Sequence, residues 1–147
     1  MDSILNYLRI SDTLGTAGQP AAEQFAGIRA AGYEVVINLA LSTSTNALPN
    51  EGDLVAAQGM EYAHIPVMWK SPTAADLERF FAAMEQHRGR KVFVHCVLNM
   101  RVSCFVFLYR VLRLGVPVET ALQDVLAIWQ PDEVWQRFVD EMQDLFA

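Results

Sequence analysis

Cysteine and positive charge are both scarce in this chain. Its 147 residues include two cysteines, and 11 lysines and arginines stand against 17 aspartates and glutamates, which gives a formal net charge of −6. Two cysteines do not make a disulfide framework, so we expect Cys96 and Cys104 to be free thiols in a reducing compartment, with the cytoplasm as the location. The negative charge repels polyanions and argues against nucleic acid as a partner.

Long apolar runs and metal-type clusters are also missing. Residues 1–9 have no basic start followed by an apolar run, and the most apolar later segment is interrupted by charged or polar residues, namely His95, Arg101, Arg110 and Arg113. We therefore expect neither a signal peptide nor a membrane-spanning segment. No group of His, Cys, Asp or Glu has the spacing of a zinc site, so we expect no metal and no cofactor.

The chain is instead rich in apolar residues. Hydrophobic residues make up 52% of it and charged residues 19%, and there is no internal repeat or low-complexity stretch. This composition predicts a single domain over residues 1–147 that is large enough to bury a core, and it leaves the oligomeric state open.

Apolar runs of strand length alternate with helical patterns along the chain. We expect strands at 14–19, 34–39, 62–67 and 91–95, and helices at 21–30, 51–58, 73–88, 102–114, 117–129 and 131–145. This order predicts an α/β fold with a mainly parallel sheet of four to five strands and helices on both faces. Ligands of such sheets bind beyond the carboxyl ends of the strands.

The run from His95 to Ser103 places a thiol, a guanidinium and a hydroxyl between an expected strand and an expected helix. Backbone amides converge at a helix N-terminus and favour negative charge there. Such surroundings and the charge of Arg101 pull the Cys96 thiol towards thiolate, and the Arg101 fork can grip two oxygens of an oxyanion. The pattern predicts an anion site with Cys96 as its nucleophile.

Four segments in a fixed order carry a family resemblance: Gly18-Gln19-Pro20, residues 36–39 (VINL), residues 64–67 (HIPV), and His95-Cys96 followed by helices. Over about residues 12–130 the chain resembles the small dual-specificity branch of the cysteine-dependent protein tyrosine phosphatases, and it looks closest to bacterial phosphatase-like domains. Only the stretch from His95 to Ser103 is specific.

The resemblance implies a dual-specificity-phosphatase-like fold and a phosphorylated protein or small molecule as substrate. It implies that Cys96 forms a phosphocysteine, that Arg101 clamps the phosphate, that the Ser103 hydroxyl assists departure of the thiolate, and that His95 holds the loop. The amides of the intervening residues would cradle the substrate, these residues being Val97, Leu98, Asn99 and Met100.

The chain departs from the family pattern in two places. Four residues separate Cys96 from Arg101 where five are usual, and none is glycine, so we expect Asn99 to supply a left-handed backbone conformation. Related phosphatases usually carry a catalytic aspartate where this chain has Met68, Trp69 and Lys70.

The first aspartate after that point is Asp76. It is a candidate general acid, although its spacing from Thr73 is that of a helix-capping box and favours a structural role. On the preceding loop, Lys70 is a candidate for attracting the phosphate and Trp69 for lining the pocket. The alternative, purely structural interpretation is a surface lysine and a packed tryptophan.

Two other functions stay open. A cradle without a proper acid also suits a non-catalytic phosphate-binding module, a pseudophosphatase. The four-residue spacing is similar to the persulfide loop of rhodanese-type sulfurtransferases, although the long helical pattern after the loop favours the phosphatase. Elsewhere we expect Cys104, Trp129 and Trp135 to pack in the core and His87 to face solvent.

Overall fold

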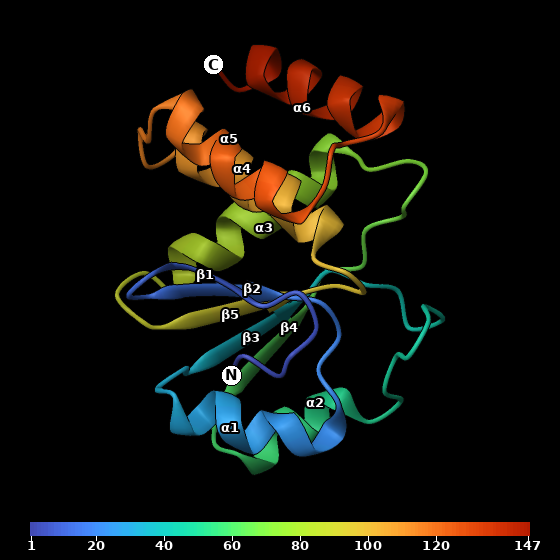
Figure 1. Ribbon diagram of the computed structural model, residues 1–147, viewed down its shortest axis with the longest axis vertical. Coiled ribbons are helices and arrows are strands. Elements are labelled where there is room, and N and C mark those ends of the chain that lie inside the picture. Colours follow the sequence, from blue (N-terminus) through green and yellow to red (C-terminus); the bar gives the residue numbers. More distant parts are fainter.

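The computed structural model describes residues 1–147 and consists of one five-stranded sheet between two layers of helices (Figure 1). The strands are β1 (Leu8–Ser11), β2 (Leu14–Ala17), β3 (Val35–Asn38), β4 (Glu61–His64) and β5 (Val92–His95). Their order across the sheet is β1-β2-β5-β3-β4; β1 is antiparallel to β2, and the other neighbours are parallel. The predicted α/β class and mainly parallel sheet are confirmed.

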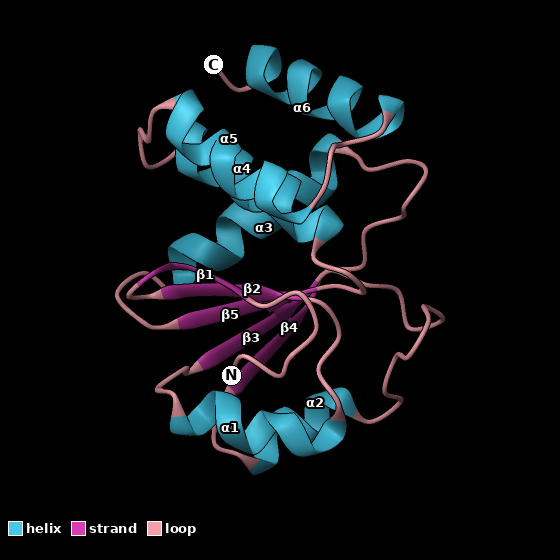
Figure 2. Ribbon diagram, in the orientation of Figure 1, coloured by secondary structure: helices cyan, strands magenta, loops and turns pink.

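The helices divide between the two faces of the sheet (Figure 2). Helices α1 (Phe25–Ala30) and α2 (Glu51–Ala57) cover one face, and a 3₁₀ turn (Ala22–Gln24) precedes α1. The other face carries α3 (Ala74–Gln86), α4 (Met100–Leu112), α5 (Val118–Ile128) and α6 (Glu133–Leu145). None of these helices is long and apolar enough to cross a membrane.

The fold differs from the sequence-based expectation in one strand and at the start of one helix. Strand β1 was not expected, because its residues alternate between exposed and half-buried and give no apolar run. Helix α4 begins at Met100 and not at Val102. Asn99 has a left-handed backbone, with φ 68°, and turns the chain directly into the helix. Arg101 therefore lies in the first turn of α4 and not in the loop before it.

The helix that carries Arg101 is buried along most of its length. Helix α4 packs against α3, α5, α6 and β2, and every residue from Arg101 to Tyr109 is buried. Phe105 stacks on Phe138 at 5.7 Å between ring centroids and contacts the ring of Trp135 at 6.0 Å. A helix that is apolar on all sides needs such cover. Cys104 and Trp135 are fully buried, as expected, and Trp129 is partly buried against the same core.

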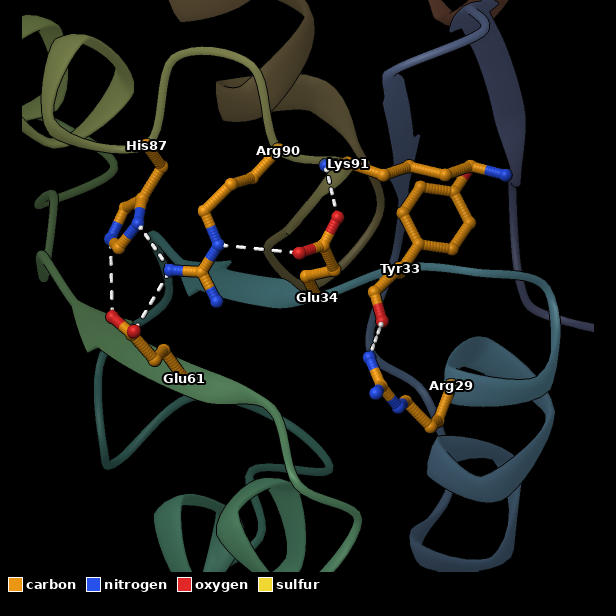
Figure 3. A network of polar contacts seen from close by, with 7 residues as sticks. All are labelled: Arg29, Tyr33, Glu34, Glu61, His87, Arg90 and Lys91. Atoms are coloured by element: carbon orange, nitrogen blue, oxygen red, sulfur yellow. Dashed lines mark hydrogen bonds and ion pairs between the residues drawn. The ribbon is translucent and has the colours of Figure 1, made fainter.

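The expectation for His87 was wrong, because only 6% of it is exposed. Figure 3 shows its ring beside Arg90, which lies 3.1 Å from His87 Nδ1 and also pairs with Glu34 and Glu61. The two glutamates and Arg90 stand at the amino ends of β3, β4 and β5. This polar network therefore closes the end of the sheet opposite to Cys96.

Candidate active site

A cavity of about 390 Å³ opens at the carboxyl ends of the parallel strands. It is lined by segments that follow β3, β4 and β5: Leu41, Thr43, Ser44, Thr45, Trp69, Cys96, Val97, Leu98, Met100 and Arg101. This is the edge at which ligands of parallel sheets bind. The structure thus brings together the cysteine, the arginine and three of the four intervening residues expected at the anion site.

The position of Cys96 is fixed by the centre of the sheet. Strand β5 lies between β2 and β3, the Cys96 amide donates to the Ala17 carbonyl at 3.3 Å, and the Leu39 amide donates to the His95 carbonyl at 2.9 Å. Cys96 is only 1% exposed and still forms part of the cavity wall. A reacting group must therefore enter the cavity to meet the sulfur.

The loop after Cys96 is held through its carbonyl groups. The Val97 carbonyl accepts from the Gln19 amide at 2.9 Å, and the Leu98 carbonyl accepts from Asn6 Nδ2 at 3.0 Å. The amides of Val97 and Leu98 donate to no backbone carbonyl. The first amides of α4 likewise have no partner within the helix. Unpaired N–H groups therefore accumulate on this short segment, as an anion cradle requires.

Asn99 makes the tight entry into α4 possible. Its left-handed φ of 68° confirms the expectation for a loop without glycine. The side chain is fully buried, and Nδ2 donates to the Asn6 carbonyl and to Thr16 Oγ1, both at 3.0 Å. Asn99 does not line the cavity, so it shapes the loop from behind.

Arg101 is a buried cation without a carboxylate partner. It is 6% exposed, its Nη1 donates to the Val67 carbonyl at 2.8 Å, and it belongs to none of the ion pairs formed by the other arginines. Buried charges are normally paired. The guanidinium forms part of the same cavity wall as the thiol, and its remaining N–H groups make the cavity attractive to an anion.

Ser103 does not reach this cavity. Because α4 begins early, its hydroxyl donates to the Met100 carbonyl at 2.6 Å and accepts from the Trp129 indole at 3.0 Å. The first bond stabilises the start of α4, and the second holds Trp129 against the helix. The hydroxyl is therefore occupied by these two partners and is not directed at Cys96 Sγ, which it was expected to assist.

Asp76 and Lys70 are not brought to the cavity either. Asp76 forms the expected capping box, in which it exchanges hydrogen bonds of 3.1 Å with Thr73, and it pairs with Arg79. Lys70 borders a separate surface hollow beside α6. Trp69 does line the cavity, and its ring contacts those of Trp129 and Trp135 at 5.4 and 5.7 Å. No carboxylate lines the cavity.

A buried pair of side chains, Glu51 and His95, lies next to Cys96 and was not expected from the sequence. His95 Nε2 lies 2.7 Å from Glu51 Oε2, with His95 0% and Glu51 3% exposed. His95 Nδ1 lies 3.2 Å from the Cys96 carbonyl, and Gln19 Nε2 donates to Glu51 Oε1 at 2.8 Å. Burial raises the pKa of Glu51, but the hydrogen bonds from His95 and Gln19 and the charge of His95 hold it below its usual value.

No signal in the sequence links these two residues. Glu51 is an ordinary first residue of a helix, and 44 positions separate it from His95. The hydroxyl residues of the cavity, Thr43, Ser44 and Thr45, belong to a polar loop whose shape no periodicity predicts. No three His, Cys, Asp or Glu side chains lie close enough together to hold a metal ion.

Known proteins match this chain in sequence and in fold. The family profile described as a DSP-PTPase phosphatase fused to NAD+ kinase matches residues 10–133. A beta-lactamase hydrolase-like protein of Agrobacterium fabrum is 34% identical over 95 residues, which is 63% of this chain and 22% of that protein. The chain therefore spans about a fifth of the length of this curated relative.

Solved structures extend the match to almost the whole chain. A putative phosphatase (DUF442) from Shewanella putrefaciens superposes with a TM-score of 0.89 at 35% identity, covering 99% of this chain and 96% of that one. TpbA of P. aeruginosa, solved in complex with pTyr, superposes with a TM-score of 0.74 at 16% identity, covering 97% and 90%. The second match concerns the fold alone. On the profile match and the architecture together, the chain belongs to the family of dual-specificity and tyrosine phosphatase-like proteins.

Proposed function

We propose that this protein is a cysteine-dependent phosphatase that hydrolyses a phosphate monoester through a phosphocysteine on Cys96. The observation that carries the proposal is Arg101, a buried guanidinium that has no carboxylate partner and shares a cavity with the thiol. The family and its phosphatase neighbours support the reaction class. The pTyr bound to TpbA supports a phosphorylated ligand.

The proposed reaction consists of two successive displacements at phosphorus. Cys96 Sγ attacks in line, the S–P bond forms, and the P–O bond to the leaving group breaks with its electron pair on oxygen. Water then attacks phosphorus, the S–P bond breaks, and inorganic phosphate and the cysteine are released. The loop amides and the Arg101 guanidinium would stabilise the equatorial oxygens in both steps. The role of Ser103 in thiolate departure remains an assignment from the family resemblance, and Asp76 remains a candidate acid that departs from the family pattern. The hydrogen bonds of both side chains would have to rearrange first.

The leaving group decides which substrates turn over. Because no carboxylate lines the cavity, the leaving oxygen must depart as an anion or take its proton from water. Aryl phosphates satisfy this condition better than alkyl phosphates. We therefore expect hydrolysis of p-nitrophenyl phosphate to be much faster than hydrolysis of a simple alkyl phosphate.

The direct test compares Cys96→Ser with Cys104→Ser. Burial raises the pKa of the Cys104 thiol to about 12, so this thiol, which lies within α4, is an inert control. We expect turnover of p-nitrophenyl phosphate to be lost in Cys96→Ser and kept in Cys104→Ser. Phosphate binding without turnover by the unmodified protein would contradict the enzyme and support the pseudophosphatase module.

Sulfur transfer is the second candidate, and the same cavity supports it. Attack of the Cys96 thiolate on the outer sulfur of thiosulfate would form a persulfide and expel sulfite, which leaves as an anion and needs no acid. The four-residue spacing to Arg101 and the absence of a carboxylate fit this chemistry. Thiocyanate production from thiosulfate and cyanide, with no hydrolysis of aryl phosphate, would replace the phosphatase proposal by this one.

A further inference from the structure

The buried pair formed by Glu51 and His95 contacts Cys96 through its backbone carbonyl. The mechanism proposed above uses neither side chain in contact with the substrate. Both side chains are polar and almost completely buried, and they come from two elements far apart in the sequence, α2 and β5. Burying such a pair is costly unless every donor and acceptor is satisfied.

The hydrogen-bond partners limit the protonation of His95. Its Nδ1 lies 3.2 Å from the Cys96 carbonyl oxygen, which can only accept, so Nδ1 must carry a proton. Its Nε2 lies 2.7 Å from Glu51 Oε2. Two states satisfy these contacts: an imidazolium beside a carboxylate, or a neutral imidazole that accepts from a protonated Glu51.

The surroundings of Glu51 favour the carboxylate. Gln19 Nε2 donates to Oε1 at 2.8 Å, so a donor from another segment reaches Glu51 in addition to His95. A carboxyl group that accepts several hydrogen bonds is stabilised in its ionised form.

We propose that Glu51 is a positioning residue that keeps His95 as a buried imidazolium and thereby stabilises the thiolate of Cys96. The Nδ1–H group fixes the peptide plane of Cys96 through its carbonyl, and the positive ring belongs to the residue directly before the nucleophile. On the cavity side, Arg101 is the other cation near the thiol. This inference rests on the proposed function, in which Cys96 is the nucleophile, and its test needs no turnover.

The test uses Glu51→Gln in a Cys104→Ser background, so that Cys96 is the single cysteine. Glutamine keeps the shape and can accept from Gln19, but its amide N–H donates to Nε2 and leaves the imidazole neutral. We expect the rate of Cys96 alkylation by iodoacetamide at neutral pH to fall about tenfold or more. The pH midpoint of the ultraviolet thiolate absorbance should move upward by a corresponding amount.

The matched control is Glu61→Gln, which makes the same change in net charge at the opposite end of the sheet, where Glu61 pairs with Arg90. Its alkylation rate should stay within about twofold of the parent, because exposed and distant charges are screened. Circular dichroism and thermal unfolding establish that both variants are folded. An unchanged alkylation rate in folded Glu51→Gln would overturn the proposal.

A second measurement decides the question if Glu51→Gln does not fold. Nitrogen-15 NMR of the parent protein should show both ring nitrogens of His95 protonated at neutral pH. Gln19→Met, which removes the side-chain donor to Glu51 Oε1, should lower the alkylation rate by about threefold. A neutral His95 ring in the parent would refute the inference. Loss of phosphatase activity alone would leave both readouts unaffected, so the two proposals fail separately.

Discussion

Gly18 tests how tightly the Cys96 loop is held. A Cβ added at Gly18 would lie 2.5 Å from the Val97 carbonyl oxygen, 3.1 Å from the Leu5 carbonyl oxygen and 3.2 Å from the Leu98 Cα. All three atoms belong to the backbone, so no flexible side chain can swing aside. In Gly18→Ala the Val97 carbonyl has to retreat by at least about 0.5 Å before the contact is tolerable. That movement is transmitted to the loop that carries the anion-binding amides.

The size of the effect follows from two opposing terms. Overpacking of this kind costs about 1–3 kcal/mol, and the loss of glycine freedom in the unfolded chain returns about 0.4–1 kcal/mol. We therefore expect Gly18→Ala to lower the free energy of unfolding by about 1–2 kcal/mol, measured by urea denaturation. Displacing the cradle by a fraction of an ångström should also lower kcat on an aryl phosphate by up to about 100-fold.

Gly27 provides the control with the opposite sign. It lies within α1, and a Cβ added there meets nothing within 4 Å. Gly27→Ala should stabilise the protein by about 0.5–1 kcal/mol and leave kcat unchanged. Equal stability of Gly18→Ala and the parent, with unchanged kcat, would refute the claim that the segment around Gly18 holds the loop.

Three further predictions concern the same region. Stability should fall in the order parent, Asn99→Gly, Asn99→Ala, because glycine adopts the left-handed backbone freely whereas alanine costs about 1–2 kcal/mol in that conformation. Thermal unfolding measures this order, and equal stability of the two variants would contradict it. The pKa of Glu51 is lower in the folded protein than in the unfolded chain, so its contribution to stability is present above its usual pKa of 4.5 and is lost as the pH falls through the lower folded-state value. Urea denaturation between neutral and acid pH should show that Glu51→Gln loses less stability on acidification than the parent. Identical pH profiles of the two proteins would speak against this. Trp135→Phe removes the indole N–H that donates to the Trp69 carbonyl at 2.9 Å and should cost about 1–3 kcal/mol of stability. It should also raise KM, because Trp69 lines the cavity. An unchanged KM would show that the Trp69 loop does not contact the substrate.

The sequence was sufficient for features that local physics determines. Strands β3 and β5 each begin with three consecutive apolar residues, and both are buried at every position. The placement of Cys96 and Arg101 at one cavity follows from a cysteine directly after such a strand and an arginine at the next helix start. Asn99 could be predicted to adopt a left-handed backbone because no glycine was present to do so.

The remaining features depend on contacts between distant segments. Strand β1 is held by its pairing with β2, and its alternation of apolar and polar residues spans only four positions, too few to predict a strand. Glu51 meets His95, and Arg90 meets Glu34, only because the sheet order brings α2, β3, β4 and β5 together. Ser103 was assigned to the sulfur on family spacing, whereas the early start of α4 and the Trp129 indole engage its hydroxyl elsewhere.

Binding of one tetrahedral oxyanion by the Cys96 loop and Arg101 is the central feature of the proposed site. A crystal structure of the protein soaked with tungstate, a phosphate mimic, tests this directly. We expect the anion in the cavity beside Cys96 Sγ, with hydrogen bonds from the amides of Val97 and Leu98 and from the Arg101 guanidinium. An empty cavity at saturating tungstate, with Arg101 bonded only to the Val67 carbonyl, would contradict it.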